Sequence, residues 1–197
     1  MKCHRLPILL ILLVCSSVVA CSNKQEMRWK EQVWLSDGRR IEVERYSVAL
    51  KSGFPDSRNG PQVYQRISYS PMGVYWESDR PVGMLSFDIF DNSAYLITDA
   101  GGRREDFCRG KMRGTYLARI YRWREGVLQE IEQGDAPIAR MRINLSGMGN
   151  WMFRDASPAK TYFSWDDIAF ATGQPSKGPP ELVSKFFNSR SSYAVCN

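Results

Sequence analysis

Apolar and polar residues alternate with a period of two along most of this chain, and turn residues separate the alternating stretches. Such a pattern is typical of half-buried antiparallel strands. The clearest pair is joined by Ser36-Asp37-Gly38, a three-residue loop that needs Gly38 in the left-handed conformation. The resulting register places four apolar residues on one face, namely Val33, Leu35, Ile41 and Val43. Trp34 falls on the opposite face, where it is either covered by a later part of the chain or available for contact.

Further strands are predicted wherever β-forming residues run between prolines or Asp-Asn turns. The predicted ranges are Gln62 to Ser70, Gly73 to Glu77, Met84 to Phe90, Ala94 to Thr98, Ala139 to Leu145 and Lys160 to Trp165. Short strands thus recur between turn residues along nearly the whole chain, which indicates a mainly β architecture.

A second hairpin is predicted from Thr115 to Trp123 and from Val127 to Glu132, with a turn at Arg124-Glu125-Gly126. Pairing through this turn places five residues on one face: Leu117, Tyr121, Trp123, Val127 and Ile131. Ile120 and Leu128 make the other face partly apolar. We therefore expect this hairpin to be central and covered on both sides.

The tail changes character at Pro179-Pro180-Glu181, which leads apolar residues at helical spacing: Leu182, Val183, Phe186 and Phe187. This predicts a short amphipathic helix with proline in its first turn. Its aromatic side chains are expected to close one end of the β core. The predicted fold is mainly β, an antiparallel sandwich-like domain or a curved meander, with a short C-terminal helix.

The first residues have the layout of a secretory signal, with a positive start at Lys2 and Arg5 and an apolar run from Leu6 to Val14. The run is too short to span a membrane. Val18-Val19-Ala20-Cys21 resembles a bacterial lipobox, which predicts a signal peptide over residues 1–20 and a covalent lipid on Cys21. An ordinary signal cut near Ala20 is the alternative.

The predicted lipidation site at Cys21 divides the chain into three parts. They are the signal peptide, a lipid anchor and short tether over residues 21–27, and a single β-rich domain over residues 28–197. Ser22 stands where an inner-membrane lipoprotein of the enterobacterial type carries Asp, so the outer membrane is the expected location. The expected partners are membrane lipid, through the anchor, and a second protein of the envelope.

Five cysteines are present, and Cys3 and Cys15 belong to the predicted signal. With Cys21 lipidated, Cys108 and Cys196 remain as an even pair in an oxidising compartment, which suggests a disulfide; two separate thiols are the alternative. The chain carries a net charge of +6. Arginines alternate with Tyr121 and Trp123 in the second hairpin, but a solvated strand face explains this better than nucleic acid, which an exported protein rarely meets.

The single histidine, His4, lies in the predicted signal. Nucleophilic catalysis through a histidine base and histidine-ligated metal sites are therefore disfavoured. We expect the protein to have no enzymatic activity and to carry no metal and no cofactor besides the lipid. Asp166-Asp167 is the adjacent acid pair that a carboxylate-dependent hydrolase would use, but a turn or helix cap explains it better. Three tryptophans are candidate contacts for a polysaccharide or peptidoglycan ligand: Trp29, Trp34 and Trp165.

The lipobox, followed by the segment from Trp29 to Arg39 with its Asp-Gly turn, resembles a family of uncharacterised proteobacterial lipoproteins. The similarity continues through the segment from Ala94 to Ile97, Cys108, the hairpin from Tyr116 to Glu130 and Asn144-Leu145. The resemblance implies an envelope lipoprotein with a β domain and implies no catalytic residue. A non-enzymatic structural or protein-interaction role is the first expectation; a polysaccharide-binding module and a hydrolase are the alternatives.

Overall fold

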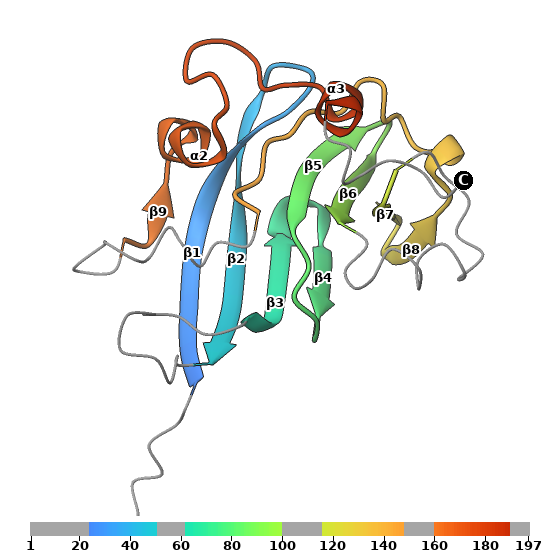
Figure 1. The fold of residues 1–197 in the computed structure, drawn as a ribbon. Helices are drawn as coiled ribbons and strands as arrows, with labels where there is room; N and C mark the ends of the chain where they lie inside the picture. Colours follow the sequence, from blue (N-terminus) through green and yellow to red (C-terminus); the bar gives the residue numbers. More distant parts are fainter. Residues whose placement is uncertain (1–23, 51–61, 100–115, 148–159, 190–197) are drawn as a thin grey trace, which may run out of the picture.

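The computed structural model describes residues 24–50, 62–99, 116–147 and 160–189 of the chain. Two β-sheets form most of the molecule in these ranges and pack face to face, with two short helices beside them (Figure 1). The predicted mainly β, sandwich-like fold is thereby confirmed. None of the described helices has the length and hydrophobicity that crossing a bilayer requires.

Sheet 1 has the strand order β4-β3-β2-β1-β9, and all neighbours are antiparallel except β1 and β9, which are parallel. Its strands are β1 (Lys24–Trp34), β2 (Arg40–Leu50), β3 (Gln62–Tyr69), β4 (Val74–Ser78) and β9 (Tyr162–Phe163). The short 3₁₀ helix η1 (Ser70–Met72) joins β3 to β4. β1 begins at Lys24, inside the predicted tether.

Sheet 2 is a fully antiparallel meander with the order β5-β6-β7-β8. Its strands are β5 (Met84–Phe90), β6 (Ser93–Asp99), β7 (Ala118–Arg124) and β8 (Val127–Ile131). A 3₁₀ helix, η2 (Gln133–Asp135), follows β8. The helices α2 (Trp165–Thr172) and α3 (Val183–Asn188) lie beside β1 and across sheet 2 respectively (Figure 1).

The first hairpin has the predicted register, because Val33 pairs with Ile41 and the Leu35 N–H donates to the Arg39 carbonyl. Gly38 has a φ of +89°, the left-handed conformation that this loop requires. Val33, Leu35 and Val43 are fully buried, with Ile41 packed against them. They meet residues of sheet 2 in the core between the sheets, which includes Met84, Phe87, Ala94, Leu96, Tyr121 and Trp123.

The outer face of sheet 2 carries a second core, in which Leu85, Ile97 and Ile120 pack against α3. Val183, Phe186 and Phe187 are buried there, so the expected role of the tail helix is confirmed. The helix begins later than expected, at Val183: Leu182 is its N-cap, and the predicted position of the prolines in its first turn is wrong.

The segment 139–145 also covers sheet 2, and its predicted strand is wrong. Arg142 forms an isolated bridge to Leu182, and the N–H groups of Asn144 and Leu145 both donate to the Leu85 carbonyl. These backbone bonds go to different partners instead of to one neighbouring strand. The apolar alternation is real, because Met141, Ile143 and Leu145 are all buried.

The second hairpin turns in two residues instead of three, since Arg124 pairs with Val127. Glu125 and Gly126 both have positive φ, +52° and +83°, which defines a type I′ turn. The register therefore shifts by one residue and turns Val127 away from Tyr121, leaving it 63% exposed. β8 is an edge strand, so the prediction of a central, doubly covered hairpin is wrong.

The predicted strand from Lys160 to Trp165 is reduced to the two residues of β9, because a helix begins directly after it. Ser164 is the N-cap of α2, and a capping box joins its side chain to the Asp167 N–H and the Asp167 carboxylate to the Ser164 N–H. Lys160 also pairs with Asp167 at 2.5 Å. The expectation that this acid pair caps a helix is confirmed for Asp167.

Asp88 links the two sheets where it meets the turn after β1. Its carboxylate is buried, and it accepts the N–H groups of Ser36 and Ile89. The Ser36 hydroxyl also contacts this carboxylate and donates to the Arg140 carbonyl at 2.6 Å. Burial raises the pKa of Asp88 above its ordinary value.

This raised pKa makes stability depend on pH. The native state holds the Asp88 proton more tightly than the unfolded state, so its contribution is full below the ordinary carboxyl pKa of about 4 and is lost as pH rises through the raised native value. We expect Asp88→Asn to remove this decline, so that the variant gains stability relative to the wild type between about pH 4 and neutrality. Urea unfolding across that range measures the difference; parallel curves would contradict it.

Candidate functional site

The three tryptophans selected from the sequence do not form an exposed platform. Trp29 is 3% exposed and Trp165 is 1% exposed, and both lie in a third core cluster with Phe163 and Ile168. The expectation that their rings stack on a ligand is wrong for these two, because residues of α2 and the Phe163 side chain of β9 pack around them. The sequence pattern did not predict α2, so the burial of these rings against that helix was not foreseen.

Trp34 lies against the same helix. Its ring meets Trp165 edge to face at a centroid distance of 5.9 Å, and the Arg40 guanidinium stacks over it at 4.2 Å. Of the two alternatives for Trp34, packing by a later part of the chain is the one observed. The remaining predicted site residues, Cys21, Cys108 and Cys196, lie outside the described residues.

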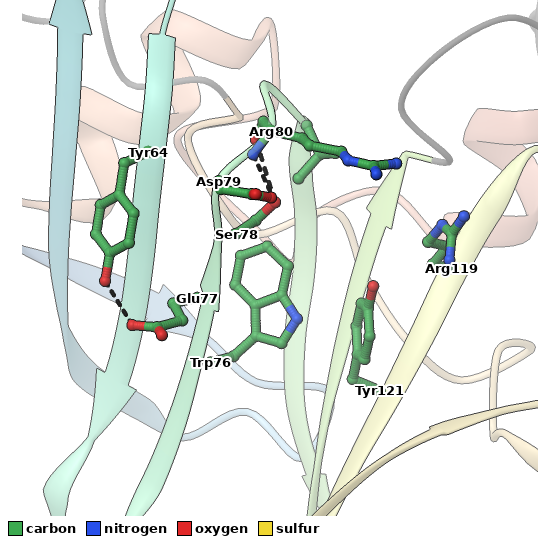
Figure 2. A pocket seen from close by; sticks show the side chains of 9 residues that line it. Tyr64, Trp76, Glu77, Ser78, Asp79, Arg80, Arg119 and Tyr121 are labelled. Carbon is green, nitrogen blue, oxygen red and sulfur yellow. Dashed lines mark hydrogen bonds between the residues drawn. The ribbon is translucent and has the colours of Figure 1, made fainter.

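A cleft of about 510 Å³ opens where the end of β4 approaches β7, at the seam between the two sheets (Figure 2). Side chains from β3, β4, β7 and the loop after β4 line it. They are Tyr64, Trp76, Glu77, Ser78, Asp79, Arg80, Val82, Arg119 and Tyr121. Its volume is in the range of small-molecule sites, and it combines aromatic with charged residues, so it is the candidate functional site.

Two aromatic rings form the floor of the cleft. Trp76 points from β4 toward sheet 2 and is 4% exposed, and Tyr121 comes from β7. Their centroids lie 5.5 Å apart with a tilt of 55°. Burial, together with the nearby Glu130 carboxylate, raises the pKa of Tyr121, which therefore keeps its hydroxyl proton at neutral pH. The Tyr121 hydroxyl is thus a hydrogen-bond donor at the edge of an apolar surface.

The cleft wraps around the end of β4, because Glu77 lies on the side of that strand away from Trp76 (Figure 2). Its carboxylate accepts the Tyr64 hydroxyl at 2.5 Å and also the Tyr75 hydroxyl. These hydrogen bonds lower the pKa of Glu77. Since a glycosidase acid needs a raised pKa to hold its proton, Glu77 is unsuited to that role.

Two arginines line the remaining wall. Arg119, from β7, pairs with Glu130 of β8 at 3.2 Å. Arg80 lies in the loop after β4, which is fixed at both ends: the Arg80 N–H donates to the Ser78 hydroxyl, and the buried Gln65 amide donates to the Val82 carbonyl at 2.6 Å. Both guanidinium groups lie in the part of the cleft toward which the Tyr121 hydroxyl points (Figure 2).

The sequence offered a partial signal for this site. Arg119 and Tyr121 belong to the stretch of alternating arginines and aromatic residues in the second hairpin. Trp76 and Arg80 come from a distant stretch, and only the packing of β4 near β7 and β8 brings them together. No family model matches the chain, and no curated protein and no solved structure is significantly similar to it.

Proposed function

We propose that the chain is a lipoprotein of the bacterial envelope, anchored at the outer membrane by a lipid on Cys21, with a non-enzymatic role in binding another envelope protein. The lipobox and the preceding signal pattern support the anchor. β1 begins at Lys24, so the two residues between it and Cys21 reach about 10 Å from the lipid. The domain then stands directly on the membrane surface, where envelope proteins meet.

The observation that carries the interaction role is the edge strand β8. Val127 is 63% exposed and Leu128 is 37% exposed, and consecutive strand residues point to opposite faces. Within the described residues, no strand pairs with the far side of β8. An exposed edge with apolar side chains on both faces is the kind of surface that accepts a strand from a partner protein.

Site-specific photo-crosslinking in intact envelopes tests this proposal. We expect a photoreactive amino acid at Val127 to give a discrete crosslinked protein, which mass spectrometry identifies. The additional substitution Leu128→Lys is expected to abolish this crosslink. The same probe at Glu42, exposed on the outer face of sheet 1, is the matched control. Identical adducts from both positions, or none from Val127, would contradict an interaction through β8.

The anchor is tested separately with a clickable palmitate analogue. We expect the wild-type chain to take up the label and to sediment with the membranes. Cys21→Ala is expected to lose the label, since the cysteine thiol is the attachment point. A labelled Cys21→Ala protein would contradict attachment at Cys21, because the lipid would then be attached elsewhere.

A polysaccharide or peptidoglycan ligand is the second candidate, and the cleft of Figure 2 favours it. Its aromatic floor and fixed charged wall have the composition of a small-molecule site, and β8 plays no part in its lining. The two candidates therefore occupy different surfaces and can be tested one at a time.

A further inference from the structure

We propose that the cleft between β4 and β7 binds a sugar ring that bears a carboxylate, as part of an acidic polysaccharide or of peptidoglycan. This proposal concerns a different surface from β8 and specifies the ligand of the second candidate function. It follows from three properties of the lining: the two guanidinium groups, the Asp79 carboxylate and the aromatic floor.

The guanidinium groups select an anion. Arg80, from the loop after β4, and Arg119, from β7, reach the same part of the cleft (Figure 2). A planar guanidinium can bind a carboxylate through two parallel hydrogen bonds, which fix the orientation of the carboxylate. The Arg119 Nη1 group donates to the Glu130 carboxylate, and this ion pair joins β7 to β8. The Tyr121 hydroxyl adds a neutral donor beside them.

The acid beside the arginines favours a ligand that also donates hydrogen bonds. Asp79 is exposed in the loop between Ser78 and Arg80 and lines the cleft, and its carboxylate accepts but does not donate. A ligand whose polar group is only a carboxylate, such as a fatty acid, would meet these oxygens without a donor to offer. A sugar offers hydroxyl groups, and an N-acetylated sugar adds an amide N–H.

The floor of the cleft completes the match. Tyr121 and the edge of Trp76 form an apolar surface beside the arginines and Asp79. A sugar ring has one face of C–H groups that can lie on such a surface while its hydroxyl groups point to the walls. One ligand class thus satisfies an anion site, hydrogen-bond acceptors and an aromatic floor at once.

Titration calorimetry of the full-length protein in detergent tests the proposal. The probes are D-glucuronic acid and N-acetylmuramic acid, each compared with its neutral counterpart, D-glucose and N-acetylglucosamine. We expect at least one acid to bind about tenfold or more tightly than its neutral counterpart, because hydrogen bonds between charged groups are stronger than those between neutral groups. Preference for glucuronic acid would indicate an acidic polysaccharide, and preference for N-acetylmuramic acid would indicate peptidoglycan.

Variants place the binding in the cleft. Arg80→Gln and Arg119→Gln are each expected to weaken binding of the acid about tenfold or more and to leave the neutral sugar unchanged. Arg122→Gln is the matched control, since Arg122 lies on β7 but on the face opposite Arg119 and contacts Gln129. Near-ultraviolet circular dichroism checks that each variant keeps its fold, and Arg80, exposed in a loop, is the safer test if Arg119→Gln does not.

Two results would overturn the proposal: equal binding of acidic and neutral sugars, or no binding of any of the four. Equal weakening by Arg122→Gln and Arg80→Gln would also overturn it, because the attraction would then be nonspecific. The crosslinking result at Val127 is independent of these outcomes, so failure of one proposal does not imply failure of the other.

Discussion

Arg45→Met is expected to lower the free energy of unfolding by about 3 to 5 kcal/mol, because it leaves a buried carboxylate without its counter-ion. Arg45 and Glu31 form an ion pair at 2.9 Å on the inward face of sheet 1, and their side chains are 1% and 0% exposed. Glu31 also accepts the Trp29 indole N–H at 2.9 Å and the Ser146 hydroxyl at 2.7 Å. No other described cation reaches Glu31.

A double variant separates loss of the pair from loss of packing. Glu31→Gln removes the charge but keeps an amide oxygen that can accept from Trp29 and Ser146. Glu31→Gln combined with Arg45→Met is therefore expected to be more stable than Arg45→Met alone, although it carries one more substitution. If the two substitutions were simply additive, the ion pair would contribute nothing beyond the packing of its side chains.

Urea unfolding followed by tryptophan fluorescence measures these changes, with Arg40→Met as the control. Arg40 is exposed, and its guanidinium stacks on Trp34 at 4.2 Å. Loss of that contact is expected to cost about 0.5 to 1 kcal/mol. A loss from Arg45→Met no larger than that from Arg40→Met would contradict the inferred cost of leaving the Glu31 carboxylate unpaired.

The ion pair of Glu31 and Arg45 also shows how much of this fold the sequence alone predicts. The alternation around Gly38 identified the buried face of the first hairpin correctly, because a glycine with positive φ allows few registers. Glu31 and Arg45 share the inward parity of Val33 and Val43, and two opposite charges at inward positions were a readable sign of a buried pair.

Other differences had no local sign. Glu125 has to adopt a positive φ to close the two-residue turn, which a non-glycine residue seldom does, so the sequence favoured a longer turn and the wrong register for β8. α2 was not predicted, because it has only eight residues and the clearest sign of its start is the capping box of Ser164 and Asp167. The cleft depends on β4 meeting β7 across two sheets, and strand order is not encoded in alternation.

The second large effect is expected at Asn144, whose side chain takes the place of a neighbouring strand at the open edge of β5. Its Oδ1 accepts the Phe87 N–H at 2.9 Å, and its Nδ2 donates to the Phe87 carbonyl at 2.8 Å and to the Trp34 carbonyl at 3.0 Å. Asn144 is fully buried. One amide therefore bonds to three backbone groups, two of them buried and the third partly buried, and ties β5 to the end of β1.

Asn144→Ala is expected to cost about 3 kcal/mol or more, since each buried backbone group left without a partner costs about 1 to 3 kcal/mol. Urea unfolding measures the loss, and Asn188→Ala, at the exposed end of α3, is expected to stay within about 0.5 kcal/mol of the wild type. A similar loss in both variants would contradict the role of the Asn144 amide.

Asn144→Asp makes the sharper test because it keeps the shape of the side chain. An ionised carboxylate cannot donate to the Phe87 and Trp34 carbonyls, whereas a protonated one donates to one carbonyl while its other oxygen accepts from the Phe87 N–H. Burial without a counter-ion raises the pKa of such a group, so the native state takes up a proton before the unfolded state does. Asn144→Asp is therefore expected to regain stability relative to Asn144→Ala as pH falls toward about 4. A pH-independent difference between these two variants would mean that Asn144 acts through its volume and not through its hydrogen bonds.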